Sequence, residues 1–130
     1  MTMKGVTISD RDPHRNVLSF DLKDLASILP FFSDDFEWEV ANLESIGPAA
    51  DELSQVSDTG VRLSGQRLAA LASSVTQVID GEFVCFQAGT GNVEAILRAV
   101  DSSAFDVLSE RHDVLEDLRR RFRDVAEIKG

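Results

Sequence analysis

The second half of the chain contains three successive segments with the composition and alternation of β-strands. The segments are Gln77–Phe86, Val93–Val100 and Ala104–Leu108, and all are rich in β-forming residues. The loops between them, Ala88–Asn92 and Asp101–Ser103, contain the small polar residues and glycines that favour turns. Strands joined by such short loops pair antiparallel, because a parallel connection needs a dozen or more residues. The region therefore predicts an antiparallel meander.

Two details refine this meander. Asp80-Gly81 interrupts the first strand and indicates either a hairpin turn or a bulge. Neither face of Val93–Val100 is fully polar, which favours a central position for this strand in the sheet.

A fourth strand is expected at Phe36–Leu43, where apolar and polar residues alternate. Phe36, Trp38 and Val40 would face the core, and the two glutamates between them would face water. The single tryptophan of the chain, Trp38, can also be interpreted as an interface anchor, since aromatic residues often dominate binding energy. The alternation favours burial, so we expect Trp38 in the core.

Three helices are expected from apolar residues at helical spacing. They are Asp21–Leu29, Gly65–Ser74 and Arg111–Val125. Ser19 or Asp21 can cap the first helix, and Ser64 can cap the second. Acidic residues early and arginines late in the third helix complement its dipole. Residues 49–60 are polar and ambiguous, with room for one or two helical turns.

These elements predict a single domain over residues 1–130, of the α+β class. We expect an antiparallel sheet of about four strands, with about three helices packed mainly on one face. An apolar content of 43% is ample for a core, so the domain needs neither a metal nor a disulfide to fold. Residues 1–16 are weakly patterned and are expected to form a loosely ordered leader, although Val6–Ile8 has the composition of a short strand.

The net charge of −10 constrains the partners of the chain. Such a charge opposes binding to nucleic-acid phosphates and to anionic membranes, and it favours a basic partner. No apolar run approaches the ~20 residues of a membrane span, and the N-terminus lacks the apolar part of a signal peptide. The one cysteine, Cys85, cannot form an internal disulfide, which favours a reducing compartment. We therefore expect a cytoplasmic protein.

The strongest functional lead is the stretch Asp34–Val61, which holds eight acidic residues and neither lysine nor arginine. It predicts a docking face for a basic protein, because opposite charges speed encounter and select partners. A plain solvated surface is the alternative. The partner-binding residues expected from this stretch are Glu37, Glu39, Glu44, Asp51 and Glu52. The arginines between Arg119 and Arg123 could neutralise this row, or could simply complete the dipole of their helix.

Catalytic, cofactor and metal sites are not supported by the sequence. His112 and the Asp101–Ser103 turn lack the nucleophile elbow of a triad enzyme. The Gly89–Asn92 loop lacks the lysine of a phosphate-binding loop, and we interpret it as a hairpin loop. His14 and His112 lie far apart in sequence, and Cys85 sits in an apolar strand. We predict no residue for any of these three kinds of site.

The preferred hypothesis is therefore a non-enzymatic cytoplasmic interaction module whose acidic face binds a basic protein. One concrete version is an immunity or inhibitor-type protein that covers the basic cleft of a nucleic-acid-cleaving toxin. A second hypothesis is a small-ligand-binding domain or enzyme with a pocket between sheet and helices, with Arg98 or Asp101 as polar contacts. A third is a structural homodimer that joins the arginine cluster to the acidic face of a second copy.

Overall fold

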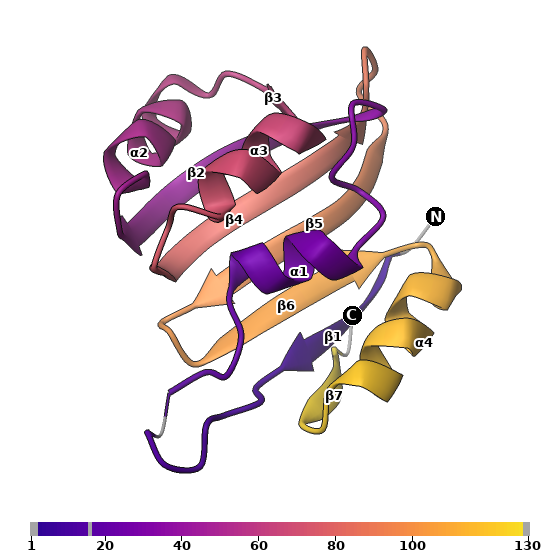
Figure 1. The fold of residues 1–130 in the computed structure, drawn as a ribbon. Coiled ribbons are helices and arrows are strands. Elements are labelled where there is room, and N and C mark those ends of the chain that lie inside the picture. The colour runs from indigo at the N-terminus through magenta and orange to yellow at the C-terminus, as the bar shows by residue number, and fades with distance from the viewer. Residues whose placement is uncertain (1–2, 16, 129–130) are drawn as a thin grey trace.

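The computed structural model describes residues 3–15 and 17–128 and shows a two-layer α+β domain (Figure 1). Its seven strands form one antiparallel sheet in the order β3-β2-β4-β5-β6-β1-β7. The strands are β1 (Lys4–Ile8), β2 (Phe36–Ile46), β3 (Leu63–Ser64), β4 (Gln77–Gln87), β5 (Val93–Val100), β6 (Ala104–Ser109) and β7 (Val125–Ile128). The helices are α1 (Leu22–Ile28), α2 (Ala50–Thr59), α3 (Gly65–Ala72) and α4 (His112–Arg121).

All four helices lie on the same face of the sheet, as Figure 1 shows, and the single core lies between the two layers. The strands bury alternate residues toward the helices. The buried strand residues include Val6, Ile8, Trp38, Val40, Phe83, Cys85, Ala95, Leu97, Phe105 and Val107. The opposite sheet face, called the open face below, is covered by no helix or strand among the described residues. Its side chains, such as Val84, Ile96 and Leu108, are only partly buried.

The α+β class and the β4–β5–β6 meander are confirmed, and β5 is the central strand. The expectation of about four strands and about three helices is wrong, because the described chain has seven strands and four helices. One strand left out of the expected sheet, β1, comes from the segment expected as a leader, in which Val6–Ile8 had the composition of a short strand. It pairs with β6 and with β7, and Val6 and Ile8 are both 0% exposed. Two buried residues are enough for a strand flanked on both sides, but they are a weak sequence signal.

The last helix is shorter than expected, because α4 ends at Arg121 and not at Val125. The carboxylate of Asp10 accepts hydrogen bonds from the backbone N–H groups of Arg123 (2.9 and 3.0 Å) and Asp124 (2.6 Å). These bonds hold the chain as it reverses to run beside β1 as β7. A contact between residues more than a hundred positions apart thus replaces the last helical turn.

The remaining missed elements are the two-residue β3 and the helix α2, which occupies the region that the sequence left ambiguous. Only Leu53 of α2 is fully buried, so its apolar signal is faint. The helix ends at Gly60, whose φ of 68° is in the left-handed region that glycine adopts without strain.

The β2–β4 pair contains irregularities that decide which way Glu44 points. Strand β4 continues through Asp80-Gly81, with register shifts against β2 beside it, so the interruption is a bulge and not a turn. Asn42 in β2 has a φ of 53°. The extra residue places Glu44 opposite Asp80, on the face that also carries Glu39.

Candidate functional site

The five acidic residues expected to bind a partner lie on two different layers of the fold. Glu37 and Glu39 alternate with the buried Trp38 and Val40, so they project from the open face, and the bulge adds Glu44 to them. Asp51 and Glu52 are exposed in the first turn of α2, in the helical layer (Figure 1). A flat partner on the open face would therefore contact the three glutamates of β2.

Trp38 is a core residue. Its side chain is 0% exposed, and its indole N–H donates a hydrogen bond to the carbonyl oxygen of Phe31 at 2.9 Å. The ring of Phe32 stacks on it with centroids 4.7 Å apart. Phe36 is only partly buried and meets Phe31 edge to face at 5.4 Å. Burial of the indole leaves the open face without the aromatic anchor that the tryptophan would have supplied.

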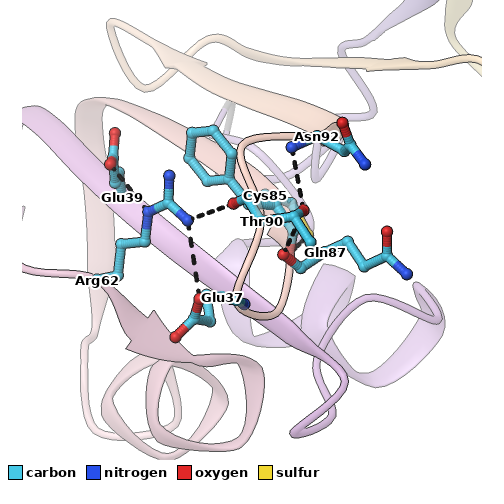
Figure 2. Close-up of polar contacts among 9 residues, drawn as sticks. Glu37, Glu39, Arg62, Cys85, Gln87, Thr90 and Asn92 are labelled. Carbon is cyan, nitrogen blue, oxygen red and sulfur yellow. Dashed lines mark hydrogen bonds and ion pairs between the residues drawn. The ribbon is translucent and has the colours of Figure 1, made fainter.

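Arg62, the first residue after the acid-only stretch, lies between the two glutamates of β2 (Figure 2). Its Nε atom donates a hydrogen bond to Oε1 of Glu39 at 3.1 Å, and its Nη1 atom lies 3.7 Å from Oε1 of Glu37. Nη1 also donates to the carbonyl oxygen of Thr90 at 2.7 Å. The guanidinium carbon lies 3.8 Å from the centroid of the Phe86 ring, a cation–π distance. We call the side chains of Glu37, Glu39 and Phe86, with the Thr90 carbonyl, the guanidinium cradle.

The hairpin loop between β4 and β5 fixes one side of this cradle (Figure 2). Gly89, with a φ of 74°, donates its backbone N–H to Oε1 of Glu37 at 2.9 Å. The Thr90 hydroxyl donates to the Gln87 carbonyl at 2.9 Å and accepts from the Asn92 N–H at 3.1 Å. The loop thus uses glycine for a left-handed turn, as the sequence indicated, and it aims the Thr90 carbonyl at Arg62.

The arginine cluster of α4 does not neutralise the glutamates of β2. Arg119 pairs with Glu116 and Glu127, whereas Arg120 and Arg121 pair with Asp117. These contacts stay within α4 and the neighbouring β7. Arg62 is the residue that pairs with Glu37 and Glu39.

The rest of the open face combines a polar row and an apolar stripe. In the polar row Arg98 pairs with Glu82 at 3.3 Å, and the Thr7 hydroxyl donates to Asp106 at 2.7 Å. The register aligns Val84, Ile96 and Leu108 across β4, β5 and β6. Ile128 of β7 continues this row on the far side of Gly5 in β1. A shallow hollow of about 450 Å³ on this face is lined by Asn42, residues 80–82 and residues 98–100.

Glu44 differs from the other acids of the open face in having no partner. Among the described residues, no hydrogen bond or ion pair holds its side chain, and the residue is exposed. Asp80 instead accepts the backbone N–H of Asp101 at 2.8 Å. Glu44 is therefore the carboxylate on this face that is best placed to meet a partner without breaking an internal contact.

The residues considered for catalysis are not brought together. Ser103 precedes β6 and donates its hydroxyl to the Val100 carbonyl, whereas His112 begins α4 beyond the far end of that strand. The six residues of β6 separate them by about 20 Å.

In the described part of the chain, no group of three or more His, Cys, Asp or Glu side chains is arranged to hold a metal ion. Burial, with a smaller contribution from Glu94, raises the pKa of the Cys85 thiol to about 12.

Arg98 and Asp101 do not lie between the sheet and the helices, where the sequence suggested that they could be polar contacts of a pocket. Arg98 borders the shallow hollow of the open face, and Asp101 lies in the β5–β6 turn with a φ of 49°. The other hollows that we found have volumes of about 300 to 350 Å³.

None of the helices within residues 3–15 and 17–128 has the length and apolar character needed to cross a membrane.

Comparisons with protein-family models, with curated proteins and with solved structures found no match to this chain. The function is therefore inferred from the geometry of the open face.

Proposed function

We propose that the protein is a non-enzymatic cytoplasmic interaction module whose open face binds a basic protein. The observation that carries this proposal is the asymmetry of the sheet. Four helices cover one face, whereas the other carries an apolar stripe and a surplus of carboxylates with no covering element among the described residues. The single cysteine, reduced and buried, is compatible with a reducing compartment.

The charge of the open face favours a basic partner. The register places at least six carboxylates on it, and their charge is opposed by two arginines, Arg62 and Arg98. The carboxylates are Glu37, Glu39, Glu44, Asp80, Glu82 and Asp106. An excess of about four negative charges on one face raises the rate of encounter with a positive surface and repels polyanions.

The apolar stripe supplies the second component that protein interfaces need. Val84, Ile96 and Leu108 lie side by side in register and are partly exposed. Stable interfaces combine a desolvated apolar centre with a polar rim, and here the carboxylates flank the stripe. A concrete occupant is the basic substrate cleft of a nucleic-acid-cleaving toxin, in which case the protein is an immunity or inhibitor-type protein.

The proposal is tested with the proteins encoded by the genes that flank the gene of this chain. Each is purified and titrated against the chain by calorimetry at low and at high salt. We expect one basic partner whose affinity falls steeply as salt rises, because screening weakens attraction between charged surfaces. Tight binding that is insensitive to salt would contradict an electrostatic docking face.

Two other hypotheses predict different results in the same samples. A structural homodimer predicts twice the mass of the chain in light scattering without any partner. A ligand-binding domain predicts small molecules bound in the shallow hollow beside Arg98, and substitution of Arg98 by alanine would then abolish binding. That hollow is the observation that favours the ligand hypothesis.

A further inference from the structure

The guanidinium of Arg62 is bound by groups from three separate parts of the chain. Carboxylates come from β2, the ring of Phe86 comes from β4, and the Thr90 carbonyl comes from the β4–β5 loop. Together they provide hydrogen-bond acceptors and an aromatic face. Both features match the planar guanidinium of arginine and are poorly used by the compact ammonium of lysine.

Most of the cradle is held in place by contacts that do not involve Arg62. Glu37 accepts the backbone N–H of Gly89, and Thr90 is fixed by its own loop hydrogen bonds. Phe86 lies near the end of β4, where it pairs with Glu37 of β2 on one side and with Val93 of β5 on the other. Removal of the arginine side chain would therefore leave the Glu37 carboxylate, the ring and the carbonyl in place, whereas Glu39 would lose its contact with Arg62 and be open to a new donor.

The backbone segment that carries Arg62 belongs to no helix or strand. Arg62 lies between Gly60, which ends α2, and the two-residue strand β3, and its neighbour Val61 is 58% exposed. The Arg62 side chain remains 31% exposed. Exposed ion pairs add little to stability, since water screens them and their side chains must be ordered. The arginine can therefore leave the cradle with a small loss of stability.

We propose that the cradle is a binding site for an arginine side chain of the partner, and that Arg62 occupies it in the free protein and is displaced on binding. The identity of the occupant as a partner residue rests on the proposed function. The capacity of the cradle to bind a free guanidinium does not depend on the proposed function, and this capacity is tested without any partner.

The test uses the variant Arg62→Ala and N-acetyl-L-arginine amide, a probe whose only charge is its guanidinium. Titration is followed by the amide NMR shift of Gly89, which donates to Glu37. We expect saturable binding with a Kd in the millimolar range, and binding to the unsubstituted protein weaker by about tenfold or more, since Arg62 competes. Adding Glu37→Gln and Glu39→Gln to the variant should remove saturation.

Two controls separate a guanidinium site from general charge attraction. N-acetyl-L-lysine amide carries the same charge and should shift Gly89 far less. Arg67→Ala removes an arginine that pairs with Glu52 in the helical layer, where no ring or carbonyl of the described residues completes the pair. That variant should not gain affinity for the probe.

Absence of saturable binding to Arg62→Ala, or equal binding of the two probes, would overturn the inference. If Arg62→Ala does not fold, Arg62→Gln keeps most of the aliphatic stem without the charge, and the same outcomes apply to it. Probe binding together with the failure of every basic partner would leave the cradle established and refute the proposed function. Partner binding without probe binding would support the proposed function and refute the cradle as a guanidinium site.

Discussion

Arg62 shows how the position of one residue changes the interpretation of a charged stretch. In the sequence it directly follows Val61, the last residue of the acid-only stretch, so no lysine or arginine lies within that stretch. In the fold the segment between α2 and β3 returns along β2 and places Arg62 between Glu37 and Glu39. Glu37 and Glu39 are therefore paired with Arg62 in the free protein, Glu52 is paired with Arg67, and Glu44 has no such partner among the described residues.

The alternation of Phe36–Val40 was sufficient to predict Trp38 in the core, because every second residue of a half-buried strand faces inward. The side on which Glu44 lies was not predictable in the same way. It depends on an extra residue near Asn42 that shifts the pairing with β4, and bulges of this kind have no strong sequence signature.

Cys85 gives a residue-scale prediction about pH. Burial raises the pKa of its thiol from an ordinary value of 9.0 to about 12, so the folded protein keeps the proton in a range where the unfolded chain loses it. The free energy of unfolding should therefore fall as pH rises above 9, by up to about 1.4 kcal/mol per pH unit. Urea unfolding at pH 8 and pH 10 measures this slope.

The variant Cys85→Ala is the control. Its free energy of unfolding should fall less steeply with pH, because the contribution of the thiol is removed. The same burial predicts that a thiol reagent at pH 8 modifies Cys85 only in denaturant. Modification of the folded protein at the rate of a free cysteine would show that the thiol is not buried.

At the scale of elements, the signals that predicted the fold were local. Asp21 and Ser64 cap α1 and α3 as the sequence indicated, with side-chain oxygens that accept backbone N–H groups. The β4–β5–β6 meander was predictable because its loops are short and rich in turn residues. By contrast, β1 and β7 pair across almost the whole length of the chain, and their pairing depends on contacts that no local pattern contains.

The turn between α4 and β7 gives an element-scale prediction. Asp10→Ala removes the carboxylate that accepts the N–H groups of Arg123 and Asp124. We expect a loss of about 1–2 kcal/mol in the free energy of unfolding, as is typical for hydrogen bonds to a charged group. Hydrogen exchange should show the loss of protection concentrated in Val125–Ile128. Asp10→Asn keeps one acceptor and should lose less, and equal protection in all three proteins would contradict the role of this carboxylate.

At the scale of the whole molecule, the acid-only stretch is not a single surface. The sheet carries Glu37, Glu39 and Glu44 on the open face, and α2 carries Asp51 and Glu52 in the helical layer. The sequence predicted an acidic stretch but not this division, because the division depends on the side of the sheet to which α2 returns. The proposed docking surface is therefore the open face alone.

The most direct test of docking through the open face compares two charge reversals of equal size. Glu44→Lys changes an exposed acid of the open face that has no partner among the described residues, and Asp51→Lys changes an exposed acid of the helical layer. Reversal of Glu37 or Glu39 is unsuitable, because it would also repel Arg62. Circular dichroism should show both variants folded.

Calorimetric titration with the basic partner then gives the affinity of each variant. We predict that Glu44→Lys weakens binding by about tenfold, as expected when one interfacial attraction becomes a repulsion, and that Asp51→Lys leaves the Kd unchanged. Equal Kd values for both variants, or a larger effect from Asp51→Lys, would contradict binding through the open face.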